Sequence, residues 1–190
     1  HSRHVFSYGN YYNPDRMHFG VLRVINEDLI APGMGYGMHP HSNMEIVTVI
    51  LEGEMLIKDN FNNEFSLRKG DIWALSAGTG IFHSELNQSR NNTLKLLQIR
   101  LLPKTTNVKP RLSKQSFVFE PNKFTEIVSP KLNGCLWLYQ DVWIYFVRFD
   151  TNQSIPYELK KPQKNGVYIY ILSGSIVINN TELINGSGMG

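Results

Sequence analysis

Two short stretches of the sequence each place two metal-binding side chains two residues apart. His39 and His41 flank Pro40, and His83 and Glu85 are separated by one residue. On a β-strand, residues i and i+2 point to the same face, so each pair directs both side chains to one side. Roughly 40 residues that read as short strands and turns separate the pairs, enough chain to bring them together. Three imidazoles and one carboxylate that converge in this way predict a site for a divalent transition metal.

Pro40 supports this geometry. Proline fixes its own φ and favours extended backbone at the preceding residue, so His39 to His41 should be rigid and extended. Because proline cannot donate a ladder hydrogen bond, the segment is expected at a strand start or a sheet edge. The glycine-rich residues 33–37 precede it and allow close backbone contact. Taken singly, each histidine could be an ordinary surface or core residue, but two same-face pairs together favour a metal site.

The donor set narrows the choice of metal. It contains no thiolate, so soft metals lose support. Four nitrogen and oxygen donors could close a tetrahedral zinc site, which would leave no open position for chemistry. The same donors suit octahedral Fe(II) with two open positions for O₂ and a chelating substrate, and Mn, Co, Ni or Cu could also occupy it. We therefore predict one divalent transition metal, and the donor set leaves the choice among Fe(II), Mn, Co, Ni and Cu open.

The composition is that of a folded globular protein. The chain has 190 residues, of which 42% are hydrophobic and 18% charged, with a net charge of +3. Lys and Arg are scattered, so no nucleic-acid partner is expected. No segment approaches the roughly 18 apolar residues of a membrane span, and no signal peptide is recognised, so no membrane association is expected. Cys135 is the single cysteine and cannot form an internal disulfide, which favours a cytoplasmic location.

Strand signals dominate the chain, and strong helix patterns with caps are absent. Turn residues such as Gly53 and Gly70 separate short apolar runs. Many short strands with regular turns predict an all-β fold built as a barrel or sandwich. Glu45 and Glu52 are expected on a strand surface or in a turn. The predicted strands cover residues 21–25, 45–51, 54–59, 64–67, 72–76 and 93–101.

The strand pattern of residues 47–58 is repeated by residues 168–179, with a glycine in register at Gly53 and Gly174. An internal repeat of this kind predicts two copies of one β domain. The second copy lacks the chemistry, because the positions that correspond to the two histidines of the first pair are Lys160 and Pro162, and no histidine follows residue 83.

A polar stretch with two prolines marks the expected join between the copies. We predict a first domain over residues 1–105 that carries the metal site, a linker over 106–115, and a second domain over 116–190 without metal ligands. The second domain is expected to be incomplete in this chain, because fewer strands follow its repeat than follow the repeat of the first domain.

The ordered motifs resemble those of the pirin family of the cupin superfamily. The resemblance is dense over residues 4–103 and thin afterwards. It rests on residues 6–28, 37–45 (GMHPHSNME), 51–54 (LEGE), 69–71 (KGD) and 76–85 (SAGTGIFHSE).

This resemblance implies a bicupin, that is, two small β-barrels of jelly-roll type, with iron held in the N-terminal barrel. Carried over residue by residue, it makes His39, His41, His83 and Glu85 the metal ligands. Some bacterial members are similar to quercetin 2,3-dioxygenases, which open a flavonol ring with O₂, and other members are regulators that bind protein partners.

Two functions follow as hypotheses. The first is a metal-dependent dioxygenase that acts on a flavonol-like small aromatic substrate with O₂. In this enzyme Glu85 would be the catalytic base that takes the substrate hydroxyl proton. The second is a non-catalytic redox-sensing regulator, in which the metal would alter a surface that a protein partner reads.

Overall fold

The computed structural model describes residues 1–131, 134–150 and 152–190, and their regular structure is entirely β. The all-β prediction is confirmed. Each of the six predicted strands is present, within a few residues at its ends. They are β2 (Leu22–Ile30), β4 (Glu45–Glu52), β5 (Glu54–Asp59), β6 (Glu64–Arg68), β7 (Asp71–Ser76) and β9 (Leu94–Leu101).

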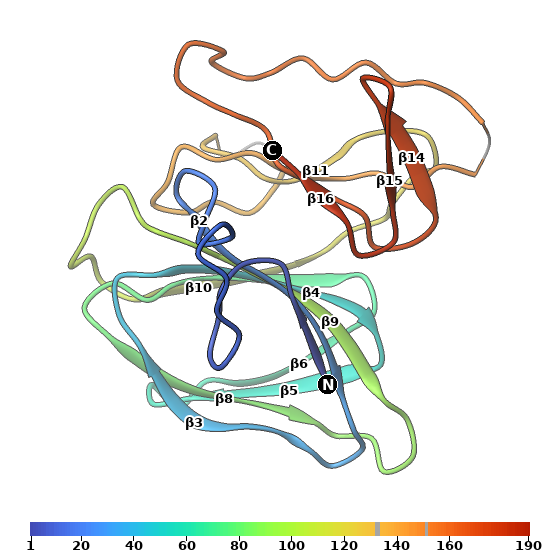
Figure 1. Cartoon of the computed structure of the whole chain (residues 1–190). Helices are drawn as coiled ribbons and strands as arrows, with labels where there is room; N and C mark the ends of the chain where they lie inside the picture. Colours follow the sequence, from blue (N-terminus) through green and yellow to red (C-terminus); the bar gives the residue numbers. More distant parts are fainter. Residues whose placement is uncertain (132–133, 151) are drawn as a thin grey trace.

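The N-terminal part of the chain forms two sheets (Figure 1). The six-stranded sheet has the order β1-β2-β9-β4-β7-β10, where β1 is Ser2–His4 and β10 is Arg111–Ser116. The four-stranded sheet has the order β3-β8-β5-β6, where β3 is Gly35–His41 and β8 is Ile81–Asn87. Described strands of one sheet do not pair with those of the other, so this half is an open sandwich of jelly-roll type, not a closed barrel.

Strand β3, which contains Pro40, lies at an edge of the four-stranded sheet. This is the position predicted for it, because an edge strand does not require every backbone N–H to donate.

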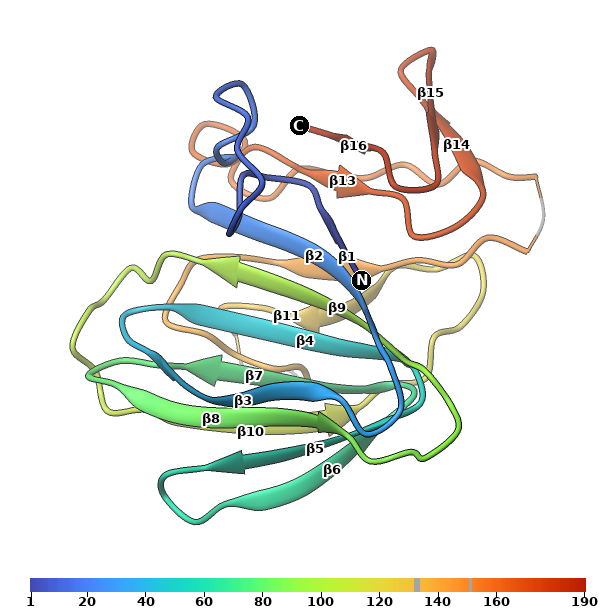
Figure 2. The ribbon, with the colours of Figure 1, turned by 60° about the horizontal axis from the view of Figure 1, so that its bottom comes forward.

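The six-stranded sheet is buried on both faces, and side chains alternate between two cores along each strand. Ile46 and Ile50 of β4 face the four-stranded sheet and join a core with Trp73. Val47 and Val49 face the other way, toward the C-terminal half. Figure 1 shows the six-stranded sheet between the four-stranded sheet and the C-terminal half, and Figure 2 shows the same strands in a view turned by 60°.

The described residues of the C-terminal half form three pairs of short strands. The pairs are β11 (Thr125–Val128) with β12 (Ile144–Phe146), β13 (Ile169–Tyr170) with β16 (Gly188–Met189), and β14 (Ser175–Ile178) with β15 (Thr181–Ile184).

The order of pairing in the C-terminal half repeats that of the first half, where β4 pairs with β7 and β5 pairs with β6. Gly53 and Gly174 also share positive φ values of 87° and 74°. The repeat seen in the sequence is therefore a repeat of topology.

The structure differs from the sequence-based expectation at two places, the predicted linker and Glu45. Residues 111–115 of the predicted linker belong to β10, which extends the six-stranded sheet by pairing with β7. Glu45, expected on a strand surface, is fully buried against the C-terminal half. Its Oε2 accepts hydrogen bonds from Ser76 Oγ at 2.6 Å and from the Tyr139 backbone N–H at 3.1 Å. Because its neighbours in sequence are strand residues with alternating faces, its burial follows from what covers the sheet, which local pattern does not reveal.

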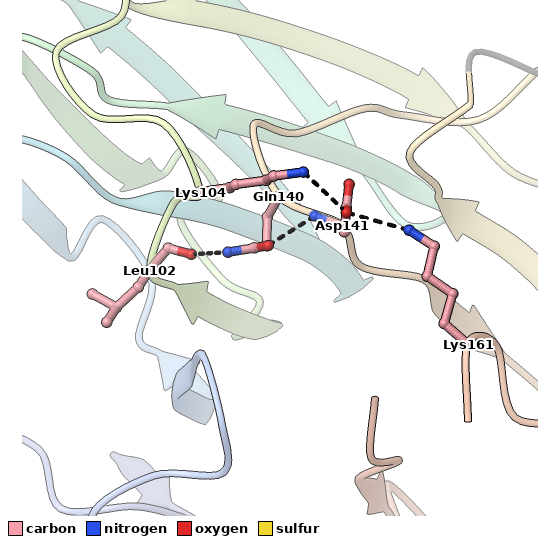
Figure 3. A network of polar contacts seen from close by, with 5 residues as sticks. All are labelled: Leu102, Lys104, Gln140, Asp141 and Lys161. Carbon is pink, nitrogen blue, oxygen red and sulfur yellow. Dashed lines mark hydrogen bonds and ion pairs between the residues drawn. The ribbon is translucent and has the colours of Figure 1, made fainter. Parts of the chain in front are cut away.

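A polar network also connects the two halves near the end of β9 (Figure 3). Gln140 Nε2 donates to the Leu102 carbonyl at 2.8 Å, and Asp141 N donates to Gln140 Oε1 at 2.8 Å. The Asp141 carboxylate accepts from Lys104 at 3.1 Å and from Lys161 at 3.3 Å. These hydrogen bonds, led by the one from Lys104, lower the pKa of Asp141.

In the part of the chain that the structure describes, there is no helix long and apolar enough to cross a membrane.

Candidate metal centre

Strands β3 and β8 carry the predicted ligands and pair directly. His39 lies opposite His83, and His41 lies opposite Ile81. Between Tyr36 and His39 the register shifts, with two residues of β3 against one of β8. Such a bulge turns the strand locally, so that Tyr36 and His39 both lie opposite inward-facing residues of β8.

Gly35 allows the close approach of these two strands. A Cβ at this position would lie 2.0 Å from the Glu85 backbone oxygen and 2.8 Å from the Leu86 Cα. Both atoms are backbone, so neither can yield without moving the strand. At Gly37, by contrast, a Cβ would meet nothing within 4 Å. The close backbone contact expected for the glycine-rich lead-in is therefore present, and it resides in Gly35.

The three histidines converge. One ring nitrogen from each of His39, His41 and His83 lies within 4.8 Å of the others. The ring centroids are 4.5 Å apart for His39 and His83, 5.0 Å for His41 and His83, and 4.9 Å for His39 and His41. This spacing brings three imidazole nitrogens close to a single point, as one metal ion requires.

The protonation of these rings suits a cation. Burial is the main cause that lowers the pKa of His41 to about 4 and of His83 to about 3. Both rings are therefore neutral near pH 7 and present free lone pairs. His41 Nε2 and both ring nitrogens of His83 are buried without a hydrogen-bond partner among the described residues. Burial of such groups unpaired is costly, and a bound metal would satisfy one nitrogen of each ring.

His39 is oriented by its own strand. Its Nδ1 lies 2.8 Å from the Gly37 carbonyl oxygen, to which a ring N–H can donate. A hydrogen bond through Nδ1 leaves Nε2 as the free donor atom for a metal, the usual arrangement for metal-binding histidines.

Glu85 is buried beside this group but is not part of the three-residue cluster. Only 1% of it is exposed. Burial raises the pKa of Glu85 to about 7, against an opposing effect of the Arg100 charge. Its Oε1 accepts a hydrogen bond from Gln98 Nε2 at 3.4 Å. The fourth predicted ligand therefore lies near the histidines as a carboxyl group whose proton is easily lost or gained around neutral pH.

Sequence reasoning missed the polar residues of β9. Gln98 and Arg100 continue the row of Leu94 and Leu96, which face the inner core. Arg100 Nε donates to Gln98 Oε1 at 2.8 Å, so the Gln98 amide links Arg100 to Glu85. The signal was present, because two polar residues at i and i+2 interrupt an otherwise apolar inward row.

A second polar pair lies on the neighbouring strands. Tyr36 Oη donates to Asp28 Oδ2 at 3.3 Å, and Asp28 is 3% exposed. Burial is the main cause that raises the pKa of Tyr36 to about 12, with the Asp28 charge adding to it. Tyr36 is therefore a neutral phenol at the rim, and its ring centroid is 6.3 Å from that of His39.

Comparison with known proteins agrees with this geometry. Residues 1–101 match the pirin family, and residues 126–190 match the quercetinase C-terminal cupin domain. A quercetin 2,3-dioxygenase of Escherichia coli is 34% identical over 188 residues, which cover 99% of this chain and 80% of that protein. A pirin-like protein of Caulobacter vibrioides is 31% identical over 193 residues, covering 100% of this chain and 82% of its own.

Among solved structures, the bacterial pirin YhhW of Escherichia coli in complex with nickel(II) superposes with a TM-score of 0.88. It is 34% identical, and the match covers 98% of this chain and 80% of that one. Fold and site thus define a cupin-type protein whose three histidines support a single divalent metal ion. Within that class, this chain belongs to the pirin family.

Proposed function

We propose that the protein is a metal-dependent dioxygenase that opens a flavonol-like aromatic substrate with O₂, in the manner of a quercetin 2,3-dioxygenase. The observation that carries the proposal is the set of unpartnered, buried nitrogens of His41 and His83, which converge with His39. The name of the relative in Escherichia coli supports the same substrate class.

We assign the metal to His39, His41, His83 and Glu85, with Fe(II) as the first candidate. A bound divalent ion would supply Lewis acidity and a template that holds the substrate oxygens beside O₂. The nitrogen and oxygen donors suit Fe, Mn, Co and Ni, so the donor types alone do not select one of these metals.

Glu85 is the residue that we assign to proton transfer. The O–H bond of the substrate hydroxyl would break, and its proton would pass to the Glu85 carboxylate while this is not bound to the metal. A general base works best when its pKa is close to the working pH, and burial raises the pKa of Glu85 to about 7 in the metal-free protein. Gln98 holds Oε1 of this carboxylate, which keeps the proton acceptor on the inner side of β8.

The test is turnover by reconstituted protein. Purified protein is loaded separately with Fe, Mn, Co, Ni or Cu, mixed with quercetin without oxygen, and then exposed to O₂ while oxygen uptake and flavonol absorbance are followed. We expect turnover with at least one metal and its loss in His83→Ala. His18→Ala is the matched control, because His18 lies outside the cluster. Absence of turnover with all five metals would refute the proposal.

A further inference from the structure

Arg100 is a charged residue at the metal centre for which the proposed reaction has no role. It lies on β9, in the inward row of Leu94 and Leu96. The Gln98 amide links it to Glu85, because Arg100 Nε donates to Gln98 Oε1 and Gln98 Nε2 donates to Glu85 Oε1. Its positive charge also contributes to the lowered pKa of His41 and of His83.

The guanidinium is held in place by two contacts. Nε donates to Gln98 Oε1 at 2.8 Å, and Cζ lies over the Tyr8 ring, 5.1 Å from its centroid. A planar guanidinium fixed by a stacked ring and a hydrogen bond has lost most of its freedom before any ligand arrives. A binding group that is already oriented loses less entropy when it binds.

The rest of the guanidinium is free. Its Nη1 and Nη2 form no hydrogen bond, and no carboxylate forms an ion pair with it, among the residues that the structure describes. Lys95, a half-buried cation on the same strand, is by contrast paired with Glu27 at 2.6 Å. An arginine that is fixed at Nε and free at both Nη groups is suited to bind a planar anion with two oxygens.

The charge of the site agrees with an anionic ligand. Arg100 acts on both His41 and His83, and the buried acids nearby are Glu85, Asp28 and Asp59, the last of which lies opposite His83 and accepts hydrogen bonds from its own turn. A divalent ion bound to three neutral histidines and an ionised Glu85 would, together with these four ligands, carry one net positive charge. A ligand with a single negative charge would neutralise it in a site that is partly shielded from water.

We propose that Arg100 is the specificity-determining residue of this site, and that it selects aromatic ligands which carry an anionic oxygen, as a carboxylate or an enolate. The proposal rests on the proposed function, since it names the substrate class of the same site. The rings of Tyr8, beside Arg100, and Tyr36, beside His39, provide aromatic surface next to the site.

The test compares salicylate with salicylamide, which have nearly the same shape but differ in charge at neutral pH. Each is titrated by calorimetry into nickel-loaded protein, and the ratio of the two Kd values is measured. In Arg100→Gln we expect the preference for salicylate to fall roughly tenfold, the size expected for a lost charge-assisted hydrogen bond. Arg100→Lys should keep part of it, because the charge remains while the planar fork is lost.

Arg68→Gln is the matched control, because Arg68 is an exposed cation that pairs with Glu54 at 3.5 Å. It removes the same charge and should leave the ratio unchanged. Metal content is measured for every variant, so that loss of nickel is not read as loss of selectivity. If Arg100→Gln does not fold, Arg100→Lys and the wild-type ratio carry the test.

An unchanged ratio in the Arg100 variants, or a wild-type protein that binds neither ligand or prefers the amide, would overturn the proposal. The measurement is independent of turnover. A protein that selects salicylate through Arg100 yet never consumes O₂ would refute the proposed oxygenase activity and leave the role of Arg100 intact.

Discussion

The assignment of Glu85 as a metal ligand can be tested through the pH dependence of metal affinity. Burial raises the pKa of this carboxyl from 4.5 to about 7, so below about pH 7 the metal-free protein holds a proton on Glu85. A metal that binds the carboxylate must displace the proton, and its affinity therefore falls as pH falls through 7. Glu85→Gln removes the proton and the oxygen charge together, so the affinity of this variant lacks that dependence.

The expected magnitude follows from the titration of one group. With a pKa of about 7, roughly three quarters of Glu85 is ionised at pH 7.5 and about one thirtieth at pH 5.5. The nickel affinity of the wild type, divided by that of Glu85→Gln, should therefore fall about 25-fold between these pH values. The histidines are present in both proteins, so their own titration cancels in the ratio.

The assay is competition for nickel(II) against a chelator of known affinity, at pH 7.5 and pH 5.5, with wild type and variant side by side. Glu45→Gln is the control, because Glu45 is also a buried carboxyl with a pKa raised by burial, but it lies on the opposite side of the six-stranded sheet. Its ratio to wild type should be the same at both pH values. A ratio for Glu85→Gln that also stays constant would show that Glu85 does not bind the metal.

Two further predictions concern backbone contact and the junction between the halves. Gly35→Ala should weaken nickel binding roughly tenfold or more, because its Cβ would push β3 away from β8. Gly37→Ala should bind nickel as the wild type does. Equal nickel affinities of the two variants in a calorimetric titration would refute the argument. Glu45→Ala should lower the free energy of unfolding by about 1–3 kcal/mol in urea, because the Tyr139 N–H loses its acceptor. A wild-type unfolding midpoint would contradict this expectation.

Local sequence pattern was sufficient for the strands and for the ligand pairs. Alternating apolar residues and turn glycines identify β4 and β5, and Pro40 identifies an edge strand, because each signal acts within a few residues. The convergence of His39, His41 and His83 also follows from the i, i+2 rule together with the pairing of two strands.

What could not be predicted depends on contacts between distant segments. The sequence of β10 is polar, and it becomes a strand only because β7 offers a free edge. Glu45 resembles a surface residue until Tyr139 and the C-terminal half cover it. Arg100 reads as an interruption of an apolar strand, and its link to Glu85 through Gln98 arises only because the two sheets, which carry β9 and β8, pack against each other.

The two-sided burial of the six-stranded sheet gives the C-terminal half a structural role. Val47, Val49, Ile72 and Ala74 line the face that the C-terminal half covers. A protein reduced to its N-terminal half would expose these side chains to water as a contiguous apolar surface and would tend to aggregate. The C-terminal half therefore contributes to the solubility and stability of the half that carries the three histidines, by covering this apolar face.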